Sequence, residues 1–336
     1  MYKNILFLLA LILLISACSK DDDPDDNGEN KEVNWTLLEG TMSYHSGGAL
    51  QLTPDNGVIV AGNLNSNYEV YKANLNFQID WNINKGAQAF EEANAVVYAD
   101  NNRYLIAGNS VFGLQAKIYV ISLDTAGSVI WSRNYGWSDI NVCYDICRSI
   151  DPNAYVMCGH VQNTKSRDAF GDIHALRINN DGDTIWYKIY PDIGEETAYA
   201  ITATTDGGFV MTGRDENNNN KDLALVKIDE NGDLQWFRFF GGNTWEEGFY
   251  VIEDSQGNIV VCGITQGATA DVYIVKTNAA GELIWEKTYG GTGGESASCV
   301  REDTPDGFII SGSIGSYSRS REMYFLKVDS DGMFGE

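Results

Sequence analysis

The chain has 336 residues, with 47 acidic and 23 basic side chains and a formal net charge of −24. So acidic a chain repels nucleic acid and anionic membrane surfaces, which excludes both as binding partners of its folded part. Glycine is abundant (35 residues), proline is scarce (5), and 12% of the residues are aromatic. This composition favours many short strands joined by tight turns over helices.

The N-terminus predicts export and a lipid anchor. Lys3 precedes an apolar run over residues 5–15, which is shorter than the roughly 20 residues that a membrane-spanning helix needs. The run ends Ile15-Ser16-Ala17-Cys18 and resembles the lipobox of bacterial lipoproteins. We therefore interpret residues 1–17 as a signal peptide and expect acylation (palmitate) on Cys18, with an ordinary secretory signal as the alternative.

Residues 18–32 are strongly acidic and cannot bury a core, so we expect a disordered tether. The stretch resembles the acidic export signal of surface lipoproteins, which implies an outer-membrane protein at the cell surface, with the periplasmic side as the alternative. Asp23, Asp25, Asn27 and Gly28 match the first half of a calcium loop, but Asn34 stands where such a loop has Glu. The sequence therefore gives no support for a bound Ca²⁺ ion.

Tryptophans followed by a glycine that closes an apolar run define an internal repeat. The distance from each tryptophan to its glycine is 27 residues, and 28 in one case, whereas the distance from that glycine to the next tryptophan varies between 19 and 27. One half of the repeat is therefore fixed in length and the other half holds an adjustable loop. The tryptophans are Trp35, Trp81, Trp131, Trp186, Trp236 and Trp285, and the glycines are Gly62, Gly108, Gly159, Gly213, Gly263 and Gly312.

One period of the repeat contains four strands. Residues 198–204 alternate in polarity and reach a turn at 206–208, and further strands cover 209–212, 223–228 and 234–240, with a second turn at 229–232. Four antiparallel strands in about 50 residues are typical of a β-propeller blade. We predict an all-β fold, a single six-bladed propeller over residues 33–336, with the N-terminal strand at 34–38 completing the last blade and closing the ring.

The repeat resembles the tryptophan-docking repeats of quinoprotein-type (PQQ-like) propellers, in which a turn glycine and a tryptophan four residues later pin neighbouring blades. Gly232 and Trp236 keep that spacing, as do three other pairs. The resemblance implies a docking role for Trp81, Trp131, Trp186, Trp236 and Trp285. Because the chain has six repeats instead of eight, a different Asp-to-Gly spacing and no adjacent cysteine pair, we expect no PQQ and no other cofactor.

Two charged columns recur through the repeat. Seventeen residues before the strand-ending glycines stand His45, Glu91, Val142, Glu196, Glu246 and Glu295. The glutamates are Glu91, Glu196, Glu246 and Glu295, and they are flanked by Glu92, Glu195 and Glu247. They form an acidic collar at the channel mouth that holds a cation or a basic partner, or, as the alternative we favour, each carboxylate accepts backbone N–H groups of its own connection. A basic column in the third strands is expected to face solvent; it consists of Lys72, Arg177, Lys227, Lys276 and Lys327.

Residues that break the repeat are the better candidates for function, because loops on a rigid scaffold vary without cost to the core. The candidate binding face comprises Trp137, Asp139, His160, Arg167, Arg214 and Trp245. The cysteines show neither a CxxC pair nor a zinc-like spacing, so no metal site is expected, and Cys147, Cys158 and Cys262 fit core positions.

No catalytic motif of the common hydrolase or nucleotide-binding kinds occurs. The leading interpretation is therefore a non-catalytic, monomeric lipoprotein that binds a glycan or a protein through its variable-loop face. An envelope assembly scaffold is the first alternative. The second is a lyase or hydrolase that uses acidic residues at the channel mouth.

Overall fold

The computed structural model describes residues 45–64, 67–76, 78–85, 90–99, 102–163, 171–191, 194–217, 220–291, 293–303, 307–315 and 322–334. The predicted signal peptide, Cys18, the acidic tether and the predicted closing strand at 34–38 lie outside these residues. Among the described residues, no helix has the length and apolarity needed to cross a membrane.

Every regular element in the described part of the chain is a β-strand. The first half contains β1 (His45–Thr53), β2 (Gly57–Leu64), β3 (Asn67–Asn74), β4 (Ile79–Lys85), β5 (Phe90–Ala99), β6 (Arg103–Phe112), β7 (Gln115–Asp124), β8 (Val129–Tyr135), β9 (Ile140–Arg148), β10 (Ala154–Gln162), β11 (Gly171–Asn179) and β12 (Thr184–Tyr190). The second half contains β13 (Glu195–Ala203), β14 (Phe209–Asn217), β15 (Asn220–Ile228), β16 (Leu234–Phe240), β17 (Trp245–Glu253), β18 (Ile259–Gln266), β19 (Ala270–Thr277), β20 (Leu283–Tyr289), β21 (Glu295–Asp303), β22 (Gly307–Ile314) and β23 (Glu322–Val328).

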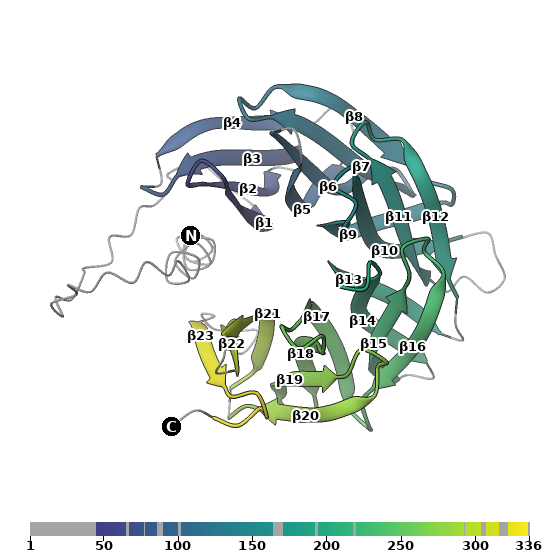
Figure 1. The fold of residues 1–336 in the computed structure, drawn as a ribbon, viewed down its shortest axis with the longest axis vertical. Coiled ribbons are helices and arrows are strands. Elements are labelled where there is room, and N and C mark those ends of the chain that lie inside the picture. The colour runs from purple at the N-terminus through teal and green to yellow at the C-terminus, as the bar shows by residue number, and fades with distance from the viewer. Residues whose placement is uncertain are drawn as a thin grey trace, which may run out of the picture.

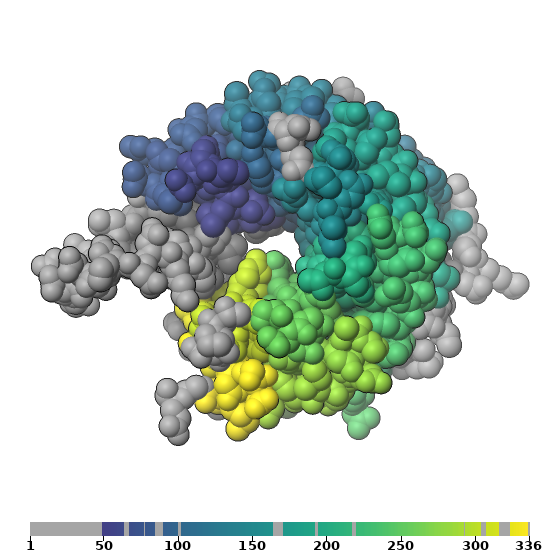
Figure 2. Space-filling view, viewed as in Figure 1, coloured from purple at the N-terminus to yellow at the C-terminus, as the bar shows by residue number. Residues whose placement is uncertain are grey.

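The strands form antiparallel sheets arranged in chain order around a central opening, as in a β-propeller (Figures 1 and 2). Strands β1, β5, β9, β13, β17 and β21 lie nearest the opening, and β4, β8, β12, β16 and β20 lie outermost. The groups β5–β8 and β9–β12 are linked into one eight-stranded sheet by a single parallel bridge between Ala116 and Ile140. The all-β propeller fold is therefore confirmed.

The blade count and the closure of the ring stay predictions. The last group has three strands in the described residues, β21 to β23, and the segment that we expect to supply the fourth lies outside them. No described pairing closes the ring.

The core lies between neighbouring sheets, and the five larger hydrophobic clusters combine residues from consecutive blades. Leu105 of β6 packs in the same cluster as Met157 of β10, and Val156 of β10 shares the next cluster with Phe209 of β14. Because both faces of an inner sheet are covered, its strands are apolar on both sides. Cys143, Cys158 and Cys262 are fully buried, and all five described cysteines are free thiols.

A tryptophan from the outermost strand of one blade docks on the last turn of the next blade. The indole of Trp186 lies against Gly232, where an added Cβ would stand 3.1 Å from the ring, and its Nε1 donates to the carbonyl of Glu230 at 3.1 Å. The same contact recurs at four other junctions, where Trp81, Trp131, Trp236 and Trp285 donate to the carbonyls of Thr125, Asn180, Ala279 and Ser330.

The turn that receives the indole is rigid. The carboxylate of Asp229 accepts the backbone N–H groups of Asn231 and Asp233, both at 2.8 Å. Gly232 has φ +77°, a conformation in which an L-residue is strained. The hydroxyl of Tyr190, from the same strand as Trp186, donates to the Gly232 carbonyl at 2.9 Å. The turn is thus held both from within and by the preceding blade.

The prediction that the basic column faces solvent is wrong for four of its five members. Lys72, Arg177, Lys227 and Lys276 are at most 7% exposed, whereas the side chain of Lys327 is 53% exposed. Lys227 is 2% exposed, and its ammonium donates to the Asp206 carboxylate at 2.7 Å and to Thr204. Lys276 likewise pairs with Asp254 at 3.0 Å. The physical reason is that each long side chain runs along its sheet to the first hairpin turn of its own blade. Although burial opposes it, the hydrogen bonds from Lys227 and Thr204 lower the pKa of Asp206 to about 2.

We predict that Gly232→Ala destabilises the protein more than Gly207→Ala does. Both glycines have positive φ, +77° and +90°, so both variants incur about 1–2 kcal/mol of backbone strain. A Cβ at Gly207 meets nothing within 4 Å, whereas one at Gly232 displaces Trp186 and adds about 1 kcal/mol or more. Urea unfolding of the two variants measures the difference, and equal losses would show that the indole contact contributes nothing.

Candidate functional site

The predicted acidic collar lies buried within the blades. Glu91, Glu196, Glu246 and Glu295 are at most 7% exposed. Glu196 accepts the N–H of Gly194 at 2.9 Å, and Glu246 and Glu295 accept those of Gly242 and Gly291 at 3.3 and 3.4 Å. Each of these three carboxylates therefore holds the connection that leads into its own strand.

The β9–β12 blade differs from the sequence alignment by one residue. Asn141 pairs with Val161, just as Glu196 pairs with Asp215 in the next blade. The residue of this blade that is equivalent to Glu196 is therefore Asn141 and not Val142. The Asn141 amide serves its own connection as well, because its Oδ1 accepts the N–H of Trp137 and its Nδ2 donates to the carbonyl of Ser138. The additional residue in this repeat shifted the prediction by one position.

Glu196 differs from the other buried glutamates in having a carboxyl group as its partner. Asp215 lies opposite it across β13 and β14, where the corresponding residue for Glu246 is Thr265, whose hydroxyl donates to Glu246 at 2.7 Å. Burial, the hydrogen bond with Asp215 and the nearby charges of Asp215 and Asp172 raise the pKa of Glu196 well above its usual range. The pair therefore holds a shared proton near neutral pH.

Three aromatic rings form a row along the central opening. The strands β9, β13 and β17 each contain a bulge, and the extra residues are Tyr144, Tyr199 and Phe249. Their ring centroids are 5.4 and 5.8 Å apart. The corresponding residues of β5 and β21 are the polar Asn94 and Ser298. The aromatic row thus occupies only one side of the opening.

Charged side chains surround this row on the face where the variable loops lie. Arg214 of β14 pairs with Glu247 of β17 at 3.4 Å and with Glu195 of β13 at 3.9 Å. Lys221 pairs with Glu247 at 3.7 Å, and its ammonium lies 4.6 Å from the centre of the Trp245 ring. These ion pairs hold the guanidinium of Arg214 between the inner strands of two blades.

His160 completes the arrangement, which we call the mouth cluster: His160, Arg214, Glu195, Glu247 and the aromatic row. The His160 imidazole stacks on Tyr144 at 6.1 Å. Burial, and then the charge of Arg214, lower its pKa to about 4, so the ring is neutral at pH 7. His160 Nδ1 and Arg214 Nε are both buried without a hydrogen-bond partner among the described residues. Such atoms are rare in proteins and mark a place that a ligand or water can fill.

The structure divides the predicted binding face. His160 and Arg214 belong to the mouth cluster. Trp245 is linked to it through Lys221, which contacts the Trp245 ring and pairs with Glu247, whereas Trp137 lies in a separate pocket with Asp172. Asp139 lies in the connection before β9, where its carbonyl accepts the N–H of Ala116. Arg167 lies outside the described residues.

The sequence interpretation missed the aromatic row. Tyr199 and Phe249 both stand 14 residues before the glycine that ends the next strand, and Tyr144 stands 15 before its own. An aromatic residue at this position in three consecutive repeats was an available signal. Among the described residues, no group of three or more His, Cys, Asp or Glu side chains is arranged to hold a metal ion.

No protein-family model matches the sequence, and no curated protein matches it either. The structure is similar to the periplasmic gluconolactonase PpgL of Pseudomonas aeruginosa, with a TM-score of 0.60 and 12% identity over 86% of this chain and 83% of that one. It is also similar to the Dos1 propeller (TM-score 0.56, 10% identity, 88% and 69% covered) and to the Pan2 WD40 domain of Neurospora crassa (0.52, 9%, 87% and 92%). At these identities the likeness shows the propeller fold.

The prediction of a non-catalytic binding module is corrected by these findings. The gluconolactonase is named for a hydrolytic activity, and the enzymatic alternative fits this comparison better than a binding module does.

We predict that Glu196→Gln stabilises the protein increasingly as pH rises. In the unfolded chain the glutamate titrates near 4.5, whereas the folded pKa is raised. Above pH 4.5 the folded state therefore holds a proton that the unfolded state has released, and the free energy of unfolding falls with pH by about 1.4 kcal/mol per unit until the folded pKa is passed. Because Gln cannot ionise, the free energy of unfolding of the Glu196→Gln variant does not fall with pH in this way.

The matched control is Glu246→Gln, since Glu246 has a hydroxyl as partner instead of a carboxyl group. Chemical unfolding of both variants and the wild type at pH 4 to 9 provides the test. A gap between Glu196→Gln and wild type that does not change with pH would contradict the shared proton.

Proposed function

We propose that this protein is a hydrolase that opens small esters or lactones at the mouth cluster. The observation that carries the proposal is the pair of buried, unpartnered atoms, His160 Nδ1 and Arg214 Nε, beside the central opening. In this proposal His160 is the general base and Arg214 stabilises the oxyanion, with Glu195 and Glu247 positioning the guanidinium.

The proposed step balances as follows. A water oxygen attacks the carbonyl carbon while His160 takes the water proton, and the carbonyl π electrons move to the oxygen, which the Arg214 Nε–H then binds. Collapse of this intermediate expels the alkoxide, which takes the proton from the imidazolium. A lactone thereby becomes a hydroxy acid, and both His160 and Arg214 return to their starting states.

The positive charge of Arg214 affects both the basicity of His160 and the stability of the oxyanion. It helps to hold the pKa of His160 at about 4, which alone would make the imidazole a weak base. When negative charge develops on an oxyanion beside the guanidinium, that positive charge is compensated and the imidazole accepts a proton more readily. The base therefore strengthens as the transition state is approached.

The aromatic row supplies a surface for the substrate. The rings of Tyr144, Tyr199 and Phe249 lie on the same side of the opening as His160, and such rings bind the apolar face of a small cyclic molecule. A gluconolactone is a suitable first substrate, since the similar periplasmic protein is named a gluconolactonase.

We predict that His160→Gln lowers kcat by about 10²–10⁴-fold, because the general base is lost. Arg214→Gln lowers kcat as well and moves the acidic limb of kcat/KM to higher pH, since the charge that lowers the pKa of His160 is removed. Lactone opening followed by pH-stat titration from pH 4 to 8 measures both effects.

The control for this experiment is Glu253→Gln on the opposite face, where Glu253 binds the N–H and hydroxyl of Thr205. It should retain full activity, whereas Glu247→Gln should not. Unchanged turnover by folded His160→Gln, or the absence of turnover by the wild type on a panel of lactones and aryl esters, would contradict the proposal.

We further propose that the enzyme is lipid-anchored at the outer membrane through Cys18 and faces the cell surface. The sequence Ile15-Ser16-Ala17-Cys18 and the acidic stretch that follows support this. The indole contacts between blades support the resemblance to tryptophan-docking repeats, while a monomeric state and the absence of a cofactor stay predictions.

We predict that Cys18→Ser abolishes palmitate incorporation and releases the protein from the membrane fraction, because two or more acyl chains are what makes such attachment stable. Metabolic labelling and fractionation measure this. Protease treatment of intact cells then distinguishes the two orientations, since a periplasmic protein would be protected, and labelling of the Cys18→Ser variant would contradict the anchor.

A further inference from the structure

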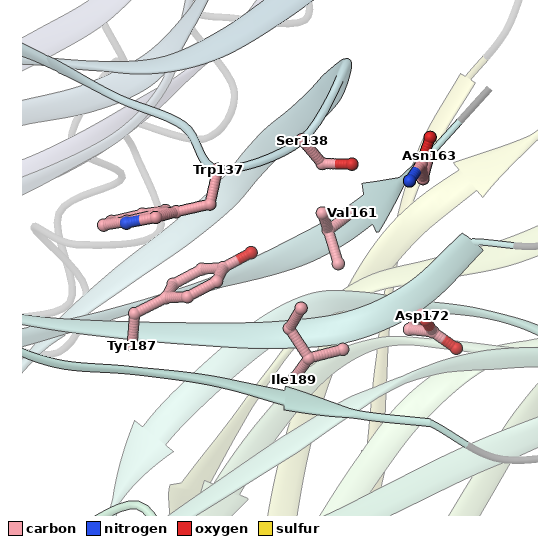
Figure 3. Close-up of a pocket in the computed structure, with 7 residues that line it drawn as sticks. All are labelled: Trp137, Ser138, Val161, Asn163, Asp172, Tyr187 and Ile189. Carbon is pink, nitrogen blue, oxygen red and sulfur yellow. The ribbon is translucent and has the colours of Figure 1, made fainter. Parts of the chain in front are cut away.

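A second pocket, separate from the mouth cluster, lies on the β9–β12 blade near its variable-loop edge. Its volume is about 260 Å³, which exceeds the space of a single water molecule several times. Figure 3 shows its lining, which comes from the connection before β9, the end of β10, the start of β11 and β12: Trp137, Ser138, Val161, Asn163, Asp172, Tyr187 and Ile189.

Aromatic and aliphatic side chains form two sides of this pocket. The indole of Trp137 stacks on the Tyr187 ring with centroids 4.0 Å apart, and it is still 52% exposed, so one of its faces is open. Val161 and Ile189 add an apolar surface, of which Ile189 is 43% exposed. An apolar molecule that covered these groups would remove them from water.

The polar side of the pocket contains an uncompensated charge. Among the described residues, no cation lies within ion-pair distance of Asp172 and no hydrogen bond reaches its carboxylate. The hydroxyl of Tyr187 is buried and has no hydrogen-bond partner there either. Burial, and then the charge of Asp172, raise the pKa of Tyr187.

The corresponding position on the next blade has a different environment. Asp222 accepts a hydrogen bond from the Asn220 amide at 3.0 Å, and Phe237 replaces Tyr187 beside it. Within the described residues, the β13–β16 blade therefore lacks the combination of a stacked tryptophan, an unpartnered hydroxyl and an unpaired carboxylate.

We propose that this pocket binds an organic ammonium ion. The ammonium group pairs with Asp172, and the alkyl part covers Ile189 and extends toward the stacked rings of Trp137 and Tyr187. A neutral polyol would leave the partly buried carboxylate uncompensated, whereas a cation neutralises it. The formal net charge of −24 also attracts cations to the protein.

The test uses three isosteric probes at constant ionic strength: butylammonium, butanol and butyrate. Tryptophan fluorescence and calorimetric titration of the full folded domain should show binding of butylammonium to the wild type and weaker or no binding of the other two. Asp172→Asn should weaken butylammonium binding roughly tenfold or more, because a charged hydrogen bond is lost. Trp137→Leu should weaken it as well.

Asp222→Asn is the matched control, because it removes the same charge from the next blade and should leave the affinity unchanged. His160→Gln should also leave it unchanged, so failure of the hydrolase proposal and failure of this one are distinguishable. Equal losses in Asp172→Asn and Asp222→Asn would overturn the site in favour of a general charge effect.

Three other results would overturn the proposal. The first is equal binding of butanol and butylammonium, and the second is tighter binding of a methyl glycoside, which would assign the pocket to sugars. The third is butylammonium binding that occurs only after Lys165→Gln and Arg167→Gln, since a cation of this chain would then be the occupant.

Discussion

An indole that rests on a turn glycine of the next blade is the contact on which the rest of the molecule depends. A single blade has two apolar faces and cannot bury both, so neighbouring blades must pack at a fixed distance and angle. The indole of Trp186 against Gly232 sets that distance, and its hydrogen bond to Glu230 sets the angle. A half-buried tryptophan removes about 100 Å² from water, which is worth about 2–3 kcal/mol at each junction.

The repeat explains why most of the fold was predictable from the sequence and why particular details were not. The spacing from tryptophan to glycine placed the strands and both turns around residues 206–208 and 229–232, because hydrogen bonding within a blade fixes their lengths. The basic column was misassigned because charged residues alternating with apolar ones are typical of an exposed strand. In this fold the ends of those strands meet the first turn, where the buried ammonium group of Lys227 pairs with the Asp206 carboxylate.

The candidate site was predictable only in part, because its members come from three blades. Of the residues that break the repeat, His160 and Arg214 interact in the structure, and Trp245 contacts Lys221, which pairs with Glu247. No sequence pattern, however, shows that Arg214 lies between carboxylates of two inner strands or that Tyr144 stacks on His160. The acidic column shows the converse: carboxylates that recur in most blades hold backbone connections, whereas Asp215, which has no counterpart, changes the protonation of Glu196.

The mouth cluster stays assembled only while two of the blade junctions are intact. His160 belongs to β10, Arg214 to β14 and Glu247 to β17, so their mutual distances are fixed by the contacts of Trp186 with Gly232 and of Trp236 with Gly281. In a protein whose blades contact mainly their neighbours, local opening at one junction costs less than global unfolding. Heat or a protease could therefore separate the base from the guanidinium while every blade is still intact, and residual β-structure would overestimate the fraction of molecules that still have an assembled site.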